Sequence, residues 1–349
     1  MFRASLRFSD GVEREVEVAA GQTVLAAAHA DGINLASQCQ IGTCGTCVGR
    51  LVKGEASMRE GCVTALTRTE VAAGHRLLCQ TAAGADPVFD MGYPSTLLDA
   101  NPLLEFTAKV SRITWLSDSV VQFEVKVPKP VGFRFTSGQY CRIKVPGTDQ
   151  WRSYSIASGE HERGRLSFLI RILPDGVMSA FLREQARVGM PLEMDGPLGS
   201  FVLDDDPRPH VMLAGGTGLA PMLSMLDKIR LMRPAPPVLL LFGCSTYSAL
   251  FGTEELEARA SYMPTLTVRT CISREPARPG HFQGNPVTVL LPSDVPADAI
   301  AYLCGAPGMV SDGIERLSAY GLSPEDLIDE LMFLSLVLEI EERLRDHAD

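Results

Sequence analysis

Hydrophobic and polar positions follow three different patterns along the 349 residues of the chain. Up to about residue 95, two alternating runs lie on either side of Asp10-Gly11 in "LRFSDGVEREVEV", which predicts a β-hairpin. "QTVLAAAHADG" predicts a short helix with Thr23 as its N-cap and Gly32 at its end. "CVGRLVKGE" predicts another strand and turn. Together these elements indicate a small α+β unit.

A second pattern, from about residue 107 to 206, consists of short strands separated by turns, with one helix, "MSAFLREQAR", between them. Six strands at this spacing predict an antiparallel barrel. The preceding "DMGYPSTLLDANPLLEF" has no periodicity and predicts a linker. The six predicted strands are "FTAKVSRITWL", "VVQFEVKV", "QYCRIKV", "RSYSIAS", "RLSFLIRIL" and "PLEMDGPLGSFVL".

A third pattern begins at about residue 207, where apolar strands alternate with amphipathic helices. "HVMLAGG" is followed by "APMLSMLDKIRLM", and the alternation continues through "PVLLLFG", "TEELEARA", "LTVRTCI", "AIAYLCG" and "GMVSDGIERLSAY". This alternation predicts a doubly wound parallel sheet.

The last residues carry leucines at helical spacing: Leu327, Leu331, Leu334 and Leu338. They predict a helical tail that covers its own domain, with a dimer or partner contact as the alternative. The predicted domains and connections are therefore 1–95, 96–106, 107–206, 207–330 and 331–349.

Composition indicates a globular protein of the cytoplasm. Apolar residues make up 46% and charged residues 21%, and the net charge of −10 argues against nucleic acid or an anionic membrane as partner. The chain begins without the apolar core of a signal peptide, and no run approaches the roughly 20 apolar residues of a membrane span. Nine cysteines, an odd number, in a reducing compartment disfavour structural disulfides.

Three of these cysteines lie within nine residues in "SQCQIGTCGTCVGR". Cys39, Cys44 and Cys47 have the spacing C-x4-C-x2-C of a plant-type 2Fe-2S centre, which needs one more thiolate. Structural zinc is the alternative, but zinc sites usually pair two C-x2–4-C knuckles. Spacing alone leaves Cys62 and Cys79 both open as the fourth ligand.

Other motifs lie at strand ends and helix starts. "RSYS" (152–155) ends a predicted strand, and "DGVMS" (175–179) opens a helix whose free N–H groups suit a phosphate. "LAGGTGLAPM" (213–222) joins a buried strand to a helix, which is the setting of a dinucleotide pyrophosphate, although Pro221 stands where a third glycine is usual. "YLCGAPGMV" (302–310) ends another strand at the same sheet edge.

These motifs, together with "DGPLGSF", occur in the order seen in the ferredoxin–NADP reductase superfamily. With a plant-type ferredoxin domain in front, residues 1 to about 330 resemble the reductase components of benzoate and anthranilate dioxygenases. The resemblance implies a multi-domain α/β plus α+β fold: a β-grasp-like 2Fe-2S ferredoxin domain, a six-stranded antiparallel FAD-binding barrel and a doubly wound parallel-sheet NAD domain.

The resemblance also implies roles for residues. It makes Cys79 the fourth iron ligand, after Cys39, Cys44 and Cys47, and it implies FAD as the flavin. Arg152 would hold the flavin pyrophosphate, while Tyr154 and Ser155 would contact the flavin ring and act catalytically. The full set implied for flavin binding is Arg152, Ser153, Tyr154, Ser155, Gly176, Met178 and Ser179.

For the pyridine nucleotide, Cys304 would lie near the nicotinamide as a third catalytic residue. The family's C-terminal aromatic residue near the flavin cannot be assigned, and Phe333 is only a candidate. The set implied for the coenzyme is Gly215, Gly216, Thr217, Gly218, Pro221, Cys304 and Gly305.

This layout predicts an NADH-dependent reductase that feeds single electrons to an oxygenase protein. Nicotinamide gives up two electrons together and an iron–sulfur cluster takes one, so a flavin between them is required. We expect NADH, although Arg274 leaves NADPH open, and a Rieske aromatic-ring dioxygenase as acceptor. The alternatives are a cytochrome P450, a diiron hydroxylase or, outside this class, a zinc-stabilised nucleotide-binding regulator.

Overall fold

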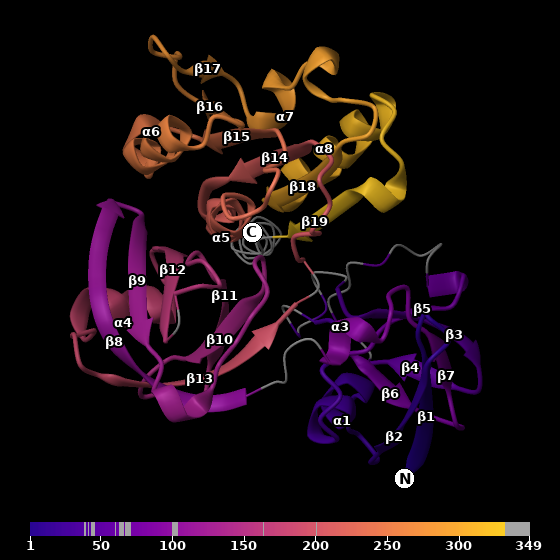
Figure 1. Ribbon diagram of the computed structural model, residues 1–349. Helices are drawn as coiled ribbons and strands as arrows, with labels where there is room; N and C mark the ends of the chain where they lie inside the picture. The colour runs from indigo at the N-terminus through magenta and orange to yellow at the C-terminus, as the bar shows by residue number, and fades with distance from the viewer. Residues whose placement is uncertain are drawn as a thin grey trace, which may run out of the picture. The chain divides into compact units, whose positions relative to one another are not determined.

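The structure is a computed structural model of the chain. It describes residues 1–37, 40, 42, 46–59, 61–62, 66, 71–99, 104–162, 164–199 and 201–331. The chain divides into two compact units, both traced in Figure 1. The first comprises residues 1–105 with 134–136 and 195–200, and the second comprises the remainder.

The first unit contains a mixed five-stranded sheet in the order β2-β1-β7-β3-β5 and a two-stranded sheet of β4 and β6. β1 and β2 form the predicted hairpin, and β7 runs parallel to β1. The elements are β1 (Phe2–Arg7), β2 (Glu13–Val18), α1 (Val24–Ala30), β3 (Val48–Lys53), β4 (Ala56–Met58), β5 (His75–Leu77), β6 (Thr81–Ala83), β7 (Val88–Asp90) and α3 (Thr96–Asp99).

Helix α1 begins and ends where the sequence predicts. The Thr23 hydroxyl accepts a hydrogen bond from the Ala26 N–H at 3.3 Å, and Gly32 follows the C-cap residue Asp31. The helix buries Val24, Leu25, Ala27 and Ala28, whose side chains pack in one core with those of the sheet. The small α+β unit is confirmed.

Part of the segment predicted as a linker is anchored to this unit. The N–H and hydroxyl of Ser95 both donate to the Asp10 carboxylate, at 2.8 and 2.7 Å, and these hydrogen bonds lower the pKa of Asp10. The ring of Tyr93 packs against Phe8 with centroids 5.7 Å apart. Low hydrophobic periodicity in this segment therefore reflects turn chemistry around Asp10 as well as a connection between domains.

Next along the chain is the barrel, a six-stranded sheet in the order β11-β10-β13-β8-β9-β12, which belongs to the second unit except for residues 104–105 of β8 and 195–198 of β13. A bridge between Ile156 and Phe168 links its two outer strands, and Phe123 and Phe168 face each other inside, fully buried. The six predicted strands are confirmed. The elements are β8 (Leu104–Ser117), β9 (Val120–Lys126), β10 (Tyr140–Lys144), β11 (Trp151–Ser155), β12 (Arg165–Arg171), α4 (Val177–Glu184) and β13 (Pro191–Leu198).

The rest of the second unit is a parallel six-stranded sheet in the order β17-β16-β15-β14-β18-β19. Successive residues of β14 enter different cores, because Met212 packs with α5 and α6 whereas Val211 and Leu213 pack with α7 and α8. Both faces are therefore covered, as expected of a doubly wound sheet. The elements are β14 (His210–Gly215), α5 (Leu219–Ile229), β15 (Val238–Cys244), α6 (Thr253–Tyr262), β16 (Leu266–Ile272), β17 (Phe282–Gln283), α7 (Pro286–Val289), β18 (Ile300–Gly305), α8 (Pro307–Ala319) and β19 (Leu327–Leu331).

The helical interpretation of Leu327 and Leu331 is wrong. Both lie in β19, which pairs in parallel with β18, Leu327 opposite Ala301 and Leu331 opposite Gly305. Residues four apart share a face in a strand as well as in a helix, so two leucines at this spacing do not distinguish the two. Leu334, Leu338 and the predicted tail after Leu331 lie outside the described residues.

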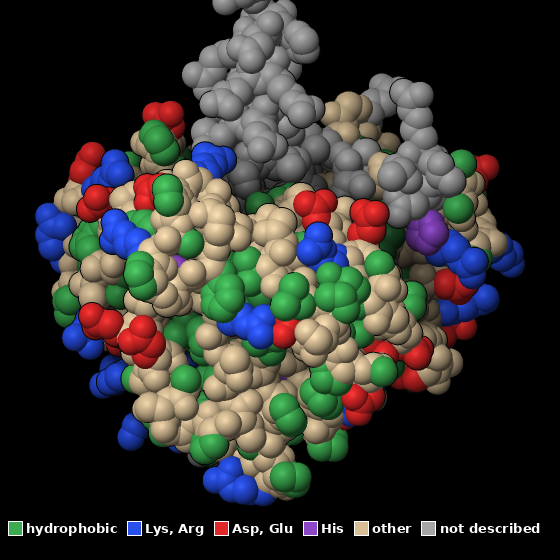
Figure 2. Space-filling view, turned by 90° about the horizontal axis from the view of Figure 1, so that it is seen from above, with side chains coloured by type: hydrophobic (Ala, Val, Ile, Leu, Met, Phe, Trp, Pro, Cys, Tyr) green, Lys and Arg blue, Asp and Glu red, His purple; other side chains and the backbone are tan. Residues whose placement is uncertain are grey.

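No helix in the described part of the chain is long and apolar enough to cross a membrane. On the face drawn in Figure 2, Lys and Arg alternate with Asp and Glu among apolar side chains. The net charge of −10 is therefore not gathered on that face.

Candidate functional site

Strand pairing brings Cys47 and Cys79 to the same end of a two-strand ladder. Cys47 directly precedes β3, and Cys79 follows β5 by two residues. The strands pair in antiparallel register with Val48 opposite Leu77, and the N–H of Leu78 donates to the carbonyl of Cys47 at 2.9 Å. The two thiols are therefore neighbours by register, although 32 residues separate them in sequence.

The surroundings of these sulfurs fit an iron–sulfur cluster. Both cysteines are buried, and the side-chain amide of Gln80 donates toward the Cys79 sulfur at 3.9 Å. Hydrogen bonds to sulfur and low solvent exposure both stabilise and tune such clusters. Cys39 and Cys44 lie outside the described residues. Cys62 lies in a separate turn, in which its backbone N–H donates to the carbonyl of Arg59, and its side chain is partly exposed.

The "RSYS" segment forms β11 in the barrel. Tyr154 lies opposite Cys141 and Ser155 opposite Tyr140 on β10, and both Tyr154 and Ser155 are buried. Burial raises the pKa of the Tyr154 phenol, which therefore keeps its proton and can donate a hydrogen bond. Ser153 precedes Tyr154 on the same strand and is partly buried.

Among the described residues, the positively charged guanidinium of Arg152 has only uncharged hydrogen-bond partners. Its guanidinium donates to the Trp151 carbonyl at 3.0 Å and to the Gln150 side-chain oxygen at 2.5 Å. No carboxylate of the described chain lies within ion-pair distance of it. A half-buried guanidinium with free donors suits a bidentate anion such as pyrophosphate.

The start of α4 offers a second set of donors. Gly176 is its N-cap and no side chain caps it, so the first backbone N–H groups have no partner within the helix. The Ser179 hydroxyl accepts the N–H of Leu173 at 2.9 Å, which closes the preceding turn and leaves the hydroxyl proton able to donate. Met178 and Ser179 are buried beneath this turn. The start of α4 therefore has free backbone donors, and its role as a phosphate site stays a prediction.

A cavity of about 400 Å³ lies at the carboxyl ends of the parallel strands. The order of the sheet reverses there, because β15 and β18 lie on opposite sides of β14, and open sheets bind ligands at such a point. Its walls come from the sheet and from the barrel. They are Ser119, Val120, Arg171, Gly215, Gly216, Thr217, Gly243, Cys244, Ser245, Ala249, Phe251, Ser273, Arg274, Asn285, Pro286, Ala306 and Met309.

The glycine turn between β14 and α5 explains why the fingerprint tolerates Pro221. Gly216 has φ +54°, and a Cβ at Gly218 would collide with the carbonyl oxygen of Cys304. Gly218 therefore supplies the close helix–strand packing for which a third glycine is usual. Pro221 is buried in the first turn of α5, where a missing N–H costs nothing.

The segments 213–222 and 302–310 lie side by side, but the side chain of Cys304 is buried away from the cavity. Ala214 pairs with Cys304, and Gly305 lies against Gly215. Cys304 is fully buried and is not among the residues that line the cavity. Sequence reasoning missed the wall residue Arg171, for which the sequence carries no motif. It also did not select Met309, although this residue lies within the motif at 302–310.

Comparison with known proteins assigns each region. Residues 7–84 match the model of the 2Fe-2S iron-sulfur cluster binding domain, 107–203 that of the oxidoreductase FAD-binding domain and 212–313 that of the oxidoreductase NAD-binding domain. The chain is 35% identical over 326 residues to the toluate 1,2-dioxygenase electron transfer component of Pseudomonas putida, covering 93% of this chain and 96% of that one. The chain belongs to the ferredoxin reductase family. It carries FAD-, NAD- and 2Fe-2S-binding domains, so the zinc alternative is excluded.

Relatives of this reductase serve more than one class of oxygenase. The reductase component of propane 2-monooxygenase from Rhodococcus jostii is 31% identical over 338 residues, 94% of this chain and 91% of that one. A cytochrome P450 reductase of Amycolatopsis, solved by crystallography, superposes with a TM-score of 0.79 at 29% identity, covering 95% of this chain and 98% of that one. The three-domain fold is confirmed along the chain.

Proposed function

We propose that this reductase takes hydride from NADH and delivers single electrons to the terminal component of a Rieske aromatic-ring dioxygenase. The observation that carries this proposal is the presence of all three cofactor-binding domains in one chain whose similarity to a dioxygenase electron transfer component extends over nearly its full length. When bound, FAD accepts electrons in pairs and releases them singly, and a 2Fe-2S cluster carries one at a time.

The iron ligands are Cys39, Cys44, Cys47 and Cys79. The register that joins β3 to β5 supports the choice of Cys79 over Cys62, together with the burial of its sulfur and the amide donor of Gln80. Burial keeps water from the sulfurs of Cys47 and Cys79, and the hydrogen bond from Gln80 would stabilise negative charge on the Cys79 sulfur.

In the barrel, Arg152 and the start of α4 hold the FAD pyrophosphate. The guanidinium supplies charge, and the N–H groups after Gly176, with Met178 beneath them and the Ser179 hydroxyl, supply donors. Tyr154, which stays protonated, would pack on the flavin ring. Ser155, buried beside it, would donate a hydrogen bond from its hydroxyl to the ring, and Ser153 would complete the flavin-binding strand.

Gly215, Gly216, Thr217 and Gly218 bind the coenzyme pyrophosphate at the start of α5, where helix N–H groups favour an anion. Pro221 shapes the first turn of that helix. Cys304 and Gly305 shape the site through the backbone. The Cys304 carbonyl packs on Gly218 and Gly305 lies against Gly215, so the two residues position the glycine turn at the nicotinamide end of the site.

NADH is the proposed coenzyme. Arg274 lines the cavity, and its backbone N–H donates to Ser245 at 2.8 Å, which places it at the end of β15. Two cavity cations, Arg171 and Arg274, keep NADPH as the alternative. The ratio of flavin reduction rates with NADH and NADPH decides between them, and Arg274→Ala should leave the NADH rate within about twofold because no 2′-phosphate is present to be held.

The proposed domains are residues 1–95, 107–206 and 207–330, with a linker at 96–106 and a tail from 331, and each matched region falls within one of them. We place the protein in the cytoplasm, which its nine cysteines support.

The test combines content and transfer. Protein purified without oxygen should contain FAD, iron and inorganic sulfide, lose its visible absorbance on addition of NADH, and support turnover by a Rieske oxygenase. A monooxygenase acceptor is the second candidate, because the cytochrome P450 reductase superposes over 95% of this chain. Turnover with a P450 or diiron hydroxylase but with no Rieske oxygenase would replace the first proposal by the second.

A further inference from the structure

Helix α5 is buried on all sides between the parallel sheet and the barrel. Every one of its residues except Lys228 is buried. Its apolar side chains share one core with Met212 and Phe242 of the sheet and with Val120 and Leu169 of the barrel. A helix in such a setting keeps polar residues at low cost only where each has a partner.

Contacts between α5 and the barrel close into a ring. The Ser137 hydroxyl donates to the Ser224 carbonyl of α5 at 3.1 Å, and the Ser137 N–H donates to Glu160 at 2.6 Å. The same Glu160 oxygen lies 3.7 Å from the ammonium of Lys228, back on α5. Ser137 precedes β10 and Glu160 follows β11, so two barrel loops are tied to one helix. We call Ser137, Glu160, Ser224 and Lys228 the clamp.

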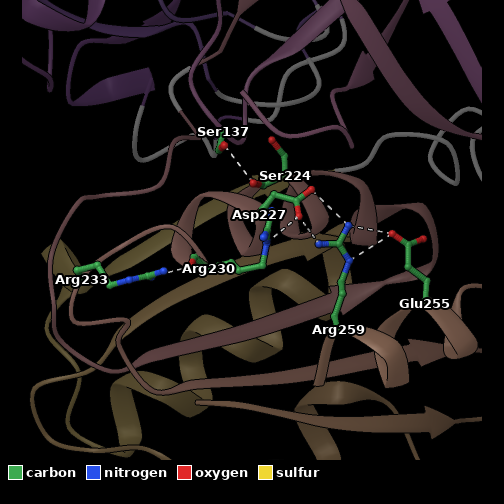
Figure 3. Close-up of polar contacts among 7 residues, drawn as sticks. All are labelled: Ser137, Ser224, Asp227, Arg230, Arg233, Glu255 and Arg259. Atoms are coloured by element: carbon green, nitrogen blue, oxygen red, sulfur yellow. Dashed lines mark hydrogen bonds and ion pairs between the residues drawn. The ribbon is translucent and has the colours of Figure 1, made fainter. Parts of the chain in front are cut away.

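Two further contacts hold α5 at fixed distances. A Cβ at Gly138 would collide with the Phe201 carbonyl and would lie 2.7 Å from the Met225 methyl, so the barrel approaches the helix as closely as backbone allows. On the sheet side, Asp227 accepts hydrogen bonds from Arg259 of α6 at 2.6 and 3.3 Å. Figure 3 shows Ser137 directed at Ser224 and Asp227 facing Arg259.

The clamp matters because α5 starts at the coenzyme cavity. Its first turn continues from Gly216–Gly218, which line or border the cavity, while Val120 and Arg171 close the cavity from the barrel. A cavity with walls on both parts changes shape if the barrel shifts against the helix. Misplacement by about 1 Å is enough to slow a transfer between two bound groups about 100-fold.

Building on the function proposed above, we propose that Lys228 and Glu160 are positioning residues for hydride transfer. By holding the barrel loops on α5, they set how a coenzyme in the cavity meets a flavin in the barrel. Lys228 also lies 2.9 Å from Asp205 in the segment that joins barrel to sheet, so its ammonium contacts both a barrel loop and this connecting segment. Partly exposed ion pairs of this kind contribute little to the free energy of unfolding. The effect of Lys228 on the position of the barrel can therefore be tested without unfolding the protein.

The experiment compares Lys228→Met, Lys228→Arg and the control Lys144→Met in the full chain loaded with FAD. Lys144 is a matched control, because its ammonium also pairs with a carboxylate, Glu193, at 3.3 Å and is similarly exposed (27% against 21%), but it lies on β10 and does not contact α5. Lys228→Met should reduce its flavin about tenfold more slowly at saturating NADH. Its affinity for NAD+ should change by less than about twofold and its Tm by no more than about 3 °C.

Two readouts separate positioning from a merely structural role. The broad long-wavelength absorbance of a nicotinamide stacked on a flavin should weaken in Lys228→Met and return in Lys228→Arg. Without coenzyme, hydrogen exchange of the amides at 137–138 and 215–219 should rise in Lys228→Met alone. Unchanged exchange there, or a rate loss shared by Lys144→Met, would overturn the positioning role. A wild-type protein that neither coenzyme reduces would overturn the proposed function instead, and the exchange data would still decide the clamp.

Discussion

The cysteine site of the first unit and the coenzyme cavity of the second are built in opposite ways. Three of the four proposed iron ligands lie within nine residues, and one antiparallel strand pair supplies the fourth. The cavity instead takes its walls from residues between 119 and 309, contributed by barrel strands, sheet strands and the starts of helices. A site that binds metal needs a few strong ligands close in sequence, whereas a site that orients two organic groups needs surfaces fixed by the whole fold. Iron binding at the cysteine site and coenzyme binding in the cavity should therefore be lost independently, each through a different set of substitutions.

The largest expected effect is on iron. Cys79→Ser should lower the iron content more than about tenfold. Loss of a residue that only hydrogen-bonds to a metal ligand already lowers metal affinity by about tenfold or more, and loss of the ligand itself should cost more. Cys62→Ser is the matched control and should retain its iron, because Cys62 lies in a separate turn. Iron analysis of both variants checks this, along with flavin reduction by NADH, which should survive in each. Equal loss of iron in the two would contradict the choice of Cys79.

Breaking the buried ion pair behind the clamp should destabilise the second unit alone. Asp227→Asn removes the buried carboxylate of Arg259, whose side chain is 9% exposed, and leaves only the more exposed Glu255 as its carboxylate partner, which should cost about 3 kcal/mol. Glu255→Gln removes a partner that is 44% exposed and should cost less than about 1 kcal/mol. Urea unfolding followed by flavin fluorescence measures both, and cluster absorbance reports the first unit. Similar costs for the two variants would show that the Asp227 pair is not the principal contact between α5 and α6.

Loss of the barrel cation should weaken flavin binding without touching iron. Arg152→Met removes charge-assisted hydrogen bonds worth about 2 kcal/mol, which corresponds to about 30-fold in the FAD dissociation constant. Arg165→Met, which removes an exposed arginine of β12, is the control and should bind FAD as the wild type does. Titration of the apoprotein with FAD gives both constants. If Arg165→Met proved as damaging, overall charge rather than a pyrophosphate contact would be responsible.

The smallest expected effect is a pH dependence of stability from His210 at the start of β14. Burial lowers the pKa of His210; Asp206 and Asp204 oppose this shift, and Arg208 adds to it. The ring packs edge-on against Tyr302, and neither of its nitrogens has a hydrogen-bond partner in the described structure. Below about pH 6.5 the unfolded chain takes up a proton on this histidine that the folded chain does not. The free energy of unfolding therefore decreases as the pH is lowered through this range.

Unfolding of the second unit at pH 5.5 and 7.5 checks this, with His210→Leu as the comparison. The difference between the two pH values should be smaller in the variant. An identical difference in both proteins would assign the dependence to carboxylates such as Asp206 and Asp326, whose pKa values are held low by hydrogen bonds from Arg208 and Ser323.

The same contrast between local and assembled features governs what the sequence could predict. The hairpin at Asp10, the cap at Thr23 and the spacing of Cys39, Cys44 and Cys47 depend on neighbours within about ten residues, so pattern reasoning reaches them. The strand periods were equally readable, because one buried face imposes alternation over each strand.

Features set by distant partners were missed. Leu327 and Leu331 look helical until the free edge of β18 is known to pair with them. The anchoring of Ser95 depends on Asp10, 85 residues earlier, and Arg171 joins the coenzyme cavity only because β12 ends beside the sheet. None of these contacts leaves a periodic or spaced signal in the chain.

An anaerobic reductive titration of the wild type and of Cys79→Ser counts the electrons that each of the two sites accepts. The wild type should take up about three electrons per chain, two in the barrel site and one at the cysteine site, and the variant about two. The NADH-driven rate of the first two should be the same in both proteins. An equal electron count in the two proteins, or a wild type that accepts no electrons from NADH or NADPH, would rule out electron transfer from coenzyme through flavin to an iron–sulfur cluster held by Cys79.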